Sequence, residues 1–251
     1  MKTFNDIQYG GLSRQTLDLY TPETPKGGVI VYFHGGGIED GDKRDKNYVE
    51  IAEKFCKNGY AFASVNYILY PQGARYPEYL EDCARAVGFI KKHMGEYGFD
   101  KIYVSGQSAG AWISLMLCFD KQFLRREGVE NSDIKGWIID SAQTTSHFNV
   151  LHYETGVDKR AQRIDRYSPM FYLGADSAFS RMFVIYYSRD MACRKEQNLL
   201  FVRAVKEFLP EADIEMIELD GTHCSGSVIK GSDGEYPFAV KALEWLKKEK
   251  A

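Results

Sequence analysis

Residues 106–110 have the sequence Gly-Gln-Ser-Ala-Gly, in which a serine hydroxyl can serve as a nucleophile. The pattern lies between a strand-like stretch and an apolar, helix-like stretch, and a sharp turn between two such elements needs small residues beside the serine. Gly106 and Gly110 meet this need, so we expect Ser108 to project above a sheet. The N-terminus of the following helix would offer free N–H groups to an oxyanion. Alone the pattern is weak, because a chain with 23 glycines also forms glycine-rich turns that carry no chemistry.

A second glycine-rich segment, His-Gly-Gly-Gly at residues 34–37, follows a run of β-branched and aromatic residues. Glycines let a backbone approach a ligand closely, and an oxyanion hole needs N–H donors about 2.7–3.1 Å from the developing charge. We expect the N–H groups of Gly36, Gly37 and Ala109 to be these donors, and His34 to support the loop without acting as a base. The alternatives are a flexible glycine loop and a phosphate loop, and the second is disfavoured because no Gly-Lys-Ser/Thr follows.

A serine nucleophile needs a histidine base, whose tautomer is fixed by an acid. Three histidines follow Ser108 in the sequence, namely His147, His152 and His223. His223 lies just after the strand-like run 214–219, where the chain order serine, acid, histidine places the base. We therefore predict that His223 is the base and that the other two histidines belong to a long segment described below.

Asp190 is the acid that we predict, because it follows the strand-like run that precedes the histidine's strand. Its alternative role is to cap the helix expected at 194–209, which is common for aspartate. Asp140 also ends a strand, but it precedes the long segment. Asp220 is too close to the histidine in sequence to orient it easily.

The elements that must hold these residues alternate between strand and helix along the chain. Such alternation indicates βαβ units, a mostly parallel sheet and helices on both faces in a three-layer sandwich. Ligands in these folds bind beyond the C-terminal ends of the strands, where all the candidate residues lie. The expected strands are 16–20, 28–33, 60–67, 101–105, 136–140, 182–187 and 214–219, and the expected helices are 47–56, 76–93, 109–119, 194–209 and 237–249.

Residues 141–174 interrupt the alternation with polar, aromatic and histidine residues. The segment is too long for an ordinary connection. We predict a small insert after the fourth parallel strand that caps the site, and two surface helices are the alternative. With this insert, residues 1–251 fit a single α/β domain.

The composition excludes several classes of function. With 32 Lys and Arg against 35 Asp and Glu, the formal charge of −3 gives no basic surplus for nucleic acid or an anionic membrane. No apolar run approaches the roughly 20 residues that span a bilayer, and the N-terminus lacks the apolar core of a signal peptide. Five widely spaced cysteines without a CxxC pair indicate reduced thiols in a cytoplasmic protein without a zinc site. Cys224, next to the predicted base, is expected to be a small buried residue.

Together these blocks resemble the α/β-hydrolase superfamily, and within it the small HGGG-type carboxylesterases of the BD-FAE-like and hormone-sensitive-lipase-like groups. The resemblance departs at Ile38, where an aromatic residue is usual, and at 186–190, where His-Gly-x-x-Asp is usual. Too few residues precede the first expected strand to form the N-terminal helical cap of the lipase-like members. The residues that carry the resemblance are 34–37 with 41–43, 65–67, 71, 76–77 with 81–82, 106–110, Asp190 and His223.

The resemblance implies a serine carboxylesterase that hydrolyses small acyl esters, with acetyl esters of carbohydrates as the expected substrates. Ser108, His223 and Asp190 would form the triad, and because the oxyanion donors are backbone groups, no metal or cofactor is required. An arylformamidase acting on an N-formylkynurenine-type substrate uses the same triad and stays open, as does a non-catalytic member of the fold that binds a small ligand. The natural acyl group, the alcohol and the oligomeric state are left open by the sequence.

Overall fold

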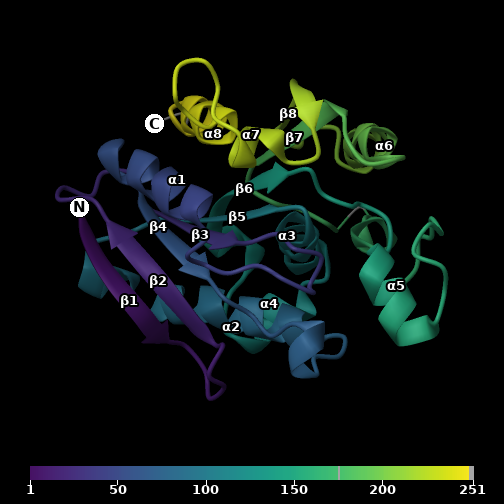
Figure 1. The fold of residues 1–251 in the computed structure, drawn as a ribbon, viewed down its shortest axis with the longest axis horizontal. Helices are drawn as coiled ribbons and strands as arrows, with labels where there is room; N and C mark the ends of the chain where they lie inside the picture. The colour runs from purple at the N-terminus through teal and green to yellow at the C-terminus, as the bar shows by residue number, and fades with distance from the viewer. Residues whose placement is uncertain (175, 249–251) are drawn as a thin grey trace.

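The computed structural model describes residues 1–174 and 176–248 of the chain. Its centre is an eight-stranded sheet in the order β1-β2-β4-β3-β5-β6-β7-β8 (Figure 1). The strands are β1 (Lys2–Gln8), β2 (Thr16–Thr21), β3 (Val29–Phe33), β4 (Ala61–Val65), β5 (Ile102–Gln107), β6 (Ile134–Asp140), β7 (Met182–Arg189) and β8 (Ile214–Thr222).

Strands β3 to β8 are parallel, whereas β1 and β2 join the sheet antiparallel to their neighbours. The parallel strands β3, β4 and β5 are buried along their whole length, as their continuous apolar sequences predict. Parallel strands need crossover connections, and helices supply these here. The mostly parallel sheet predicted from the alternating pattern is thus confirmed, as is the α/β-hydrolase fold that the resemblance implies.

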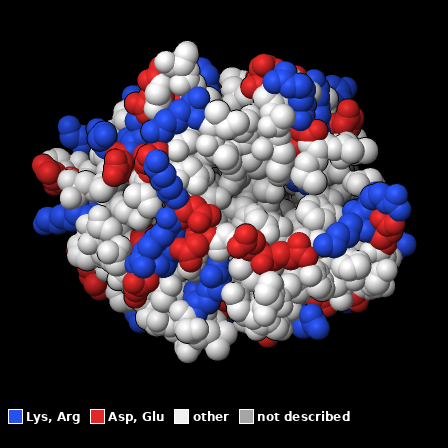
Figure 2. Space-filling view, in the orientation of Figure 1, with Lys and Arg blue, Asp and Glu red and all other residues white. Residues whose placement is uncertain are grey.

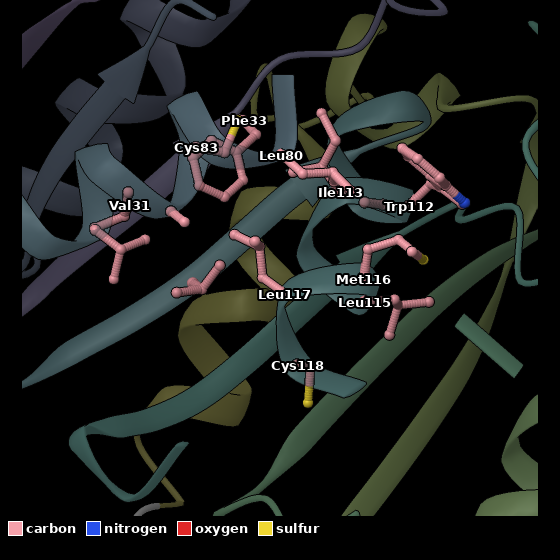
Figure 3. Packing of buried hydrophobic residues seen from close by; sticks show 14 of the residues in the cluster. Val31, Phe33, Leu80, Cys83, Trp112, Ile113, Leu115, Met116, Leu117 and Cys118 are labelled. Atoms are coloured by element: carbon pink, nitrogen blue, oxygen red, sulfur yellow. The ribbon is translucent and has the colours of Figure 1, made fainter. Parts of the chain in front are cut away.

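Helices cover both faces of the sheet. Helices α1 and α8 pack on one face, and α2, α3 and α6 pack on the other. Every residue of α3 is buried, and its Ile113 and Leu117 belong to one hydrophobic cluster with Val31 and Phe33 of β3 (Figure 3). A helix that is apolar all round must be central, so the segment after Ser108 is held firmly. The helices are α1 (Lys46–Lys57), α2 (Glu78–His93), α3 (Ala109–Phe119), α4 (Gln122–Arg126), α5 (Phe148–Thr155), α6 (Arg194–Phe208), α7 (Ser225–Val228) and α8 (Pro237–Leu246).

The strand β1 is a correction to the sequence analysis, which placed the first strand at 16–20. Lys2–Gln8 pairs with β2 from Lys2 opposite Thr21 to Gln8 opposite Thr16, with an irregularity between Phe4 and Ile7. The strand is almost entirely exposed and is stabilised by its ladder of backbone hydrogen bonds. A polar edge strand of this kind lacks the apolar alternation by which strands are predicted.

The segment 141–174 lies between β6, the fourth parallel strand, and β7. It contains α5 and a short 3-10 helix, η4 (Pro169–Tyr172), and Figure 1 shows α5 at the side of the molecule where α3 begins. The Trp112 indole N–H donates to the Tyr167 carbonyl over 3.0 Å, which ties the segment to α3. The role of this segment as a cap stays a prediction. That residues 1–251 form a single domain also stays a prediction.

The closing helix α8 ends at Leu246, three residues before the predicted end, and Glu249 lies outside the described residues. In the described part of the chain, no helix has the length and apolarity that crossing a membrane requires.

Candidate active site

Ser108 lies in the tight turn from β5 to α3, with its backbone in an unusual conformation (φ 55°, ψ −113°). The turn requires both flanking glycines. A Cβ on Gly106 would lie 2.3 Å from the backbone of Gly110, and a Cβ on Gly110 would lie 2.0 Å from the Phe33 carbonyl oxygen. The Ser108 N–H donates to the Asp140 carbonyl over 2.8 Å, which fixes the turn against β6. The serine is half-buried at the C-terminal edge of the sheet.

The structure brings His223 and Asp190 to this serine from the ends of β8 and β7. His223 Nε2 lies 2.9 Å from Ser108 Oγ, and His223 Nδ1 lies 2.5 Å from Asp190 Oδ1. A carboxylate can only accept, so Nδ1 carries the proton and Nε2 is left to accept from the serine hydroxyl. This tautomer is the one that a general base needs.

Asp190 is held as a carboxylate by its hydrogen-bond donors. Its side chain is only 1% exposed, and burial alone would raise its pKa. Donors from His223, Ser141 and the Met191 N–H more than offset this effect, so the pKa of Asp190 lies below its usual value. The alternative capping role is not seen, because the N-cap of α6 is Cys193.

The two rival aspartates have other partners. Asp220 is exposed and pairs with Arg189 and the Ser188 hydroxyl. Asp140 is fully buried and accepts from the Tyr187 and Ser227 hydroxyls. Burial raises the pKa of Asp140 to about 7, and the charge of Asp190 adds to the shift. Among the residues that the structure describes, neither rival is hydrogen-bonded to the base.

The loop after β3 turns two backbone N–H groups away from protein acceptors. The Gly35 carbonyl accepts from His34 Nδ1 (2.7 Å), and the Gly36 carbonyl accepts from the N–H groups of Glu39 and Asp40 (3.0 Å each). In a trans peptide the N–H points opposite to the preceding carbonyl. The N–H groups of Gly36 and Gly37 therefore point to the other side, where they find no acceptor in the described part of the chain.

These N–H groups lie beside the nucleophile. A Cβ on Gly35 would lie 3.5 Å from the Ser108 Cβ, so the loop passes directly next to the serine. The third expected donor, Ala109 N–H, is the first of α3 and has no acceptor within its helix. Gly36 (φ 101°) and Gly37 (φ 67°) adopt left-handed conformations that favour glycine. The arrangement can bind an oxyanion formed at Ser108.

His34 supports this loop from below. Its ring is fully buried, stacks on Tyr67 at 4.4 Å and lies 3.4 Å from an Arg14 amino group through Nε2. Burial, assisted by the charge of Arg14, lowers the pKa of His34 to about 4. His34 is therefore neutral at physiological pH and donates from Nδ1 to the loop, which agrees with the structural role expected for it.

A buried hydrogen-bonded chain beneath the serine was not found by sequence reasoning. The Gly35 N–H donates to the Tyr48 hydroxyl, which donates to Gln107 Oε1 over 2.5 Å. Gln107 Nε2 donates to Ser227 Oγ (2.7 Å), which donates to Asp140 (2.8 Å). The chain links the oxyanion loop, β5 and β6. Its one sequence signal is the glutamine beside the nucleophile.

The insert also contributes a residue that no motif predicts. Asn149 Nδ2 donates both of its hydrogens, to the Gly37 carbonyl and to Glu39 Oε2, each over 2.8 Å. A Cβ on Gly37 would lie 3.8 Å from the ring of Phe148. The start of α5 is thus attached to the oxyanion loop, and Phe148 borders the space beside it.

The two histidines of the insert, His147 and His152, are not hydrogen-bonded to the serine. His147 precedes α5, is buried between Trp112 and Phe148, and has a pKa lowered well below its usual value by burial and neighbouring positive charges. His152 is exposed on α5.

The thiols divide into four that are buried and one that is exposed. All five cysteines are free, and Cys193 is the exposed one. Burial raises the pKa of Cys56 to about 12 and holds those of Cys83, Cys118 and Cys224 well above the usual value. A thiol that stays protonated is a poor nucleophile, so Cys224 does not compete with the serine.

One face of the molecule is hollowed, and among the described residues the floor of the hollow carries no charged side chains. Figure 2 shows this hollow in the middle of one face, in the part of the view where Figure 1 places α3 below α7, with charged side chains around its rim. A floor of this kind suits a neutral ligand that is anchored by a few polar groups.

The chain resembles known esterases both in sequence and in fold. The BD-FAE family matches residues 17–150, more than half of the chain. An acetyl esterase of Salmonella schwarzengrund is 32% identical over 104 residues, which cover 40% of this chain and 31% of the relative. A probable isoprenylcysteine alpha-carbonyl methylesterase of Arabidopsis thaliana, ICMEL1, is 29% identical over 148 residues, which cover 57% of this chain and 29% of the relative. The chain thus spans about a third of the length of these curated relatives.

A further curated relative and two solved structures extend the comparison. The kynurenine formamidase avaC of Aspergillus versicolor is 32% identical over 105 residues, covering 37% of this chain and 36% of the relative. A carbohydrate esterase from gut microbiota superposes with a TM-score of 0.79 at 14% identity, covering 99% and 96% of the two chains. Esterase Est2 of Thermogutta terrifontis superposes with a TM-score of 0.77 at 19% identity, covering 97% of this chain and 93% of the esterase. The fold thus has its counterpart in known esterases, and the chain belongs to the BD-FAE family of α/β-hydrolases.

Proposed function

We propose that this protein is a serine carboxylesterase that hydrolyses small acyl esters. The observation that carries the proposal is the continuous hydrogen-bonded series from Ser108 through His223 to Asp190, with distances of 2.9 and 2.5 Å. The non-catalytic alternative requires one of these groups to be missing or displaced, and none is.

In the proposed reaction, His223 Nε2 takes the proton of Ser108 while the serine oxygen attacks the ester carbonyl. Asp190 holds the imidazole in its tautomer and stabilises the imidazolium that forms. The N–H groups of Gly36, Gly37 and Ala109 stabilise the tetrahedral oxyanion, each contributing about 3 kcal/mol. His223 then protonates the leaving alcohol, and a water activated by the same histidine hydrolyses the acyl-enzyme.

Acetyl esters of carbohydrates are the substrates that we propose. Support comes from the acetyl esterase among the relatives and from the carbohydrate esterase with the same fold. Within the site, the ring of Phe148 stands close to Gly37 and limits the space for an acyl chain there. An arylformamidase is the second candidate, because a kynurenine formamidase is similarly related to this chain and the same triad serves amide hydrolysis.

The test is hydrolysis of 4-nitrophenyl acetate by the wild type and by Ser108→Ala. We expect the variant to lose at least about 10³-fold in kcat, because no other group replaces the nucleophile. Ser105→Ala is the matched control, since it removes a buried hydroxyl of β5 that has no partner in the described part of the chain. Full activity of Ser108→Ala would refute the proposal.

A substrate panel then separates the two candidates. Acetylated oligosaccharides, feruloyl esters and N-formylkynurenine are compared by kcat/KM. We expect the acetylated oligosaccharides to give the highest value, whereas a preference for N-formylkynurenine would assign the enzyme to the formamidases.

A further inference from the structure

Ser141, directly after β6, touches both members of the acid–base pair. Its hydroxyl donates to Asp190 Oδ2, and its Oγ lies 2.9 Å from His223 Nδ1. Because a carboxylate can only accept, the hydroxyl proton is directed to Asp190, and the oxygen lone pair faces the Nδ1 proton. The Nδ1 proton is thus shared between Asp190 and Ser141.

We propose that Ser141 is a positioning residue, which locks the Asp190 carboxylate and through it the His223 ring in the geometry that general-base catalysis requires. The proposal rests on the proposed esterase function and adds a fourth residue to its acid–base machinery.

The two oxygens of Asp190 depend on different donors. Oδ1 receives the Nδ1 proton of His223 and the N–H of Met191 (2.6 Å). For Oδ2, Ser141 is the one donor among the residues that the structure describes. The carboxylate is 1% exposed, so water does not replace a lost donor easily. Without the Ser141 hydroxyl, a buried charged oxygen is left unsatisfied, and the carboxylate is free to rotate away from the ring.

The backbone of Ser141 is held in a strained conformation. Its φ is 58°, in the left-handed region that non-glycine residues seldom adopt. The N–H donates to the Ile185 carbonyl over 2.9 Å, and the carbonyl accepts from Arg194 Nη1 over 2.9 Å. Arg194 is itself almost fully buried. Strained residues persist where the surroundings enforce them, and they gather at functional sites. Glycine would adopt this φ without strain, but it would lack the hydroxyl that Ser141 directs at Asp190.

The test compares Ser141→Ala and Ser141→Gly with the wild type on 4-nitrophenyl acetate. We expect kcat to fall about tenfold in both, with KM changed less than about twofold, because the lost contact acts on the base and not on the substrate. The kcat/KM–pH profile should change as well, since the lost donor alters how Asp190 holds the imidazole that takes up the serine proton. Gly relieves the backbone strain and Ala does not, so a shared loss is due to the hydroxyl.

Ser188→Ala is the matched control. Ser188 also donates to an aspartate at the edge of the sheet, but that aspartate is Asp220, which is not part of the triad. We expect this variant to keep the wild-type kcat and pH profile. The proton NMR signal of His223 Nδ1–H gives a readout that does not need turnover, and it should shift in Ser141→Gly and stay in place in Ser188→Ala.

The outcomes separate this proposal from the proposed function. Suppose that hydrolysis depends on Ser108 and yet keeps its kcat and pH profile in Ser141→Gly. This result would overturn the positioning role alone. An equal loss in Ser188→Ala would also overturn it, because general loosening of the sheet edge would then explain the effect. A wild type without Ser108-dependent hydrolysis would overturn both.

Discussion

Three aspartates end neighbouring strands, and burial together with donors distinguishes them at the scale of single residues. Asp190 is buried beside three donors that favour its charged form, Asp140 is buried with a raised pKa, and Asp220 is exposed in an ion pair. Only a charged, fixed carboxylate can hold an imidazole that becomes positive in the transition state. The residue-scale chemistry therefore favours Asp190.

We predict that Asp190→Asn lowers kcat by roughly 10⁴-fold, because the amide can hold the histidine in the wrong tautomer. Asp220→Asn is the control, with the same change one strand away. Its ion pair with Arg189 is exposed to solvent and contributes little to stability, so kcat should stay within twofold. Steady-state kinetics of both variants decide the matter, and similar losses would contradict the assignment of Asp190.

At the scale of elements, the insert and the oxyanion loop are joined through the start of α5. Asn149 clamps the Gly37 carbonyl, and Glu39 of the same loop also accepts from the Tyr153 hydroxyl (2.7 Å) and from Lys159. A movement of α5 as a lid would therefore pull on the loop that carries two of the three proposed oxyanion donors. The hydrogen bonds thus join the insert to the proposed oxyanion loop.

We predict that Asn149→Ala lowers kcat about tenfold, since Gly37 is then held less firmly against the developing charge. Asn131→Ala is a matched control, because Asn131 Nδ2 also donates to two acceptors, the Cys118 and Ala178 carbonyls, and Cys118 lies near the end of α3 opposite Ser108. Both variants should lose about 1–3 kcal/mol of stability from unmet hydrogen bonds, measured by urea unfolding. Equal kcat values in the two variants would refute the link.

The elements of the sheet differ in how well the sequence predicts them. The central parallel strands were found because burial on both faces demands continuous apolar runs, as in Val29–Phe33, whereas β8 is only partly buried. The polar edge strand β1 was missed because, apart from Ile7, which packs against the core, its sequence lacks the apolar alternation of a strand. The sequence predicts Ser108 through its glycines and Asp190 through its place in the chain order, and the structure places both beside His223. Ser141 and Asn149 could not be found, because each is a single polar residue whose importance arises from contacts with distant segments.

At the scale of the whole molecule, one buried carboxyl group influences the stability of the fold. Asp140 has a pKa of about 7 in the folded protein, against about 3.9 in an unfolded chain. Between these values the folded state holds a proton that the unfolded state releases. The contribution of Asp140 to stability therefore falls as pH rises from about 4 to 7, by at most about 1.4 kcal/mol per pH unit, and is level above that window.

We predict that Asp140→Asn gains stability relative to the wild type as pH rises from 5 to 7.5, because the amide does not ionise. Urea unfolding across this range measures the difference. Asp220→Asn is the reference: the pKa of Asp220 is lowered by its donors, so its contribution is already complete at pH 5 and its difference from the wild type should be constant. A constant difference for Asp140→Asn as well would show that Asp140 does not titrate in this window.

The distribution of the thiols makes this protein suitable for single-site labelling. A maleimide dye reacts with an accessible thiolate, and four of the five cysteines are buried with raised pKa values, which leaves Cys193 as the point of attachment in the native chain. Cys193 lies three residues after Asp190 and forms the N-cap of α6. A fluorophore placed there would lie three residues from Asp190 in the chain without any engineered residue, and its emission offers a way to follow the proposed acyl-enzyme in real time.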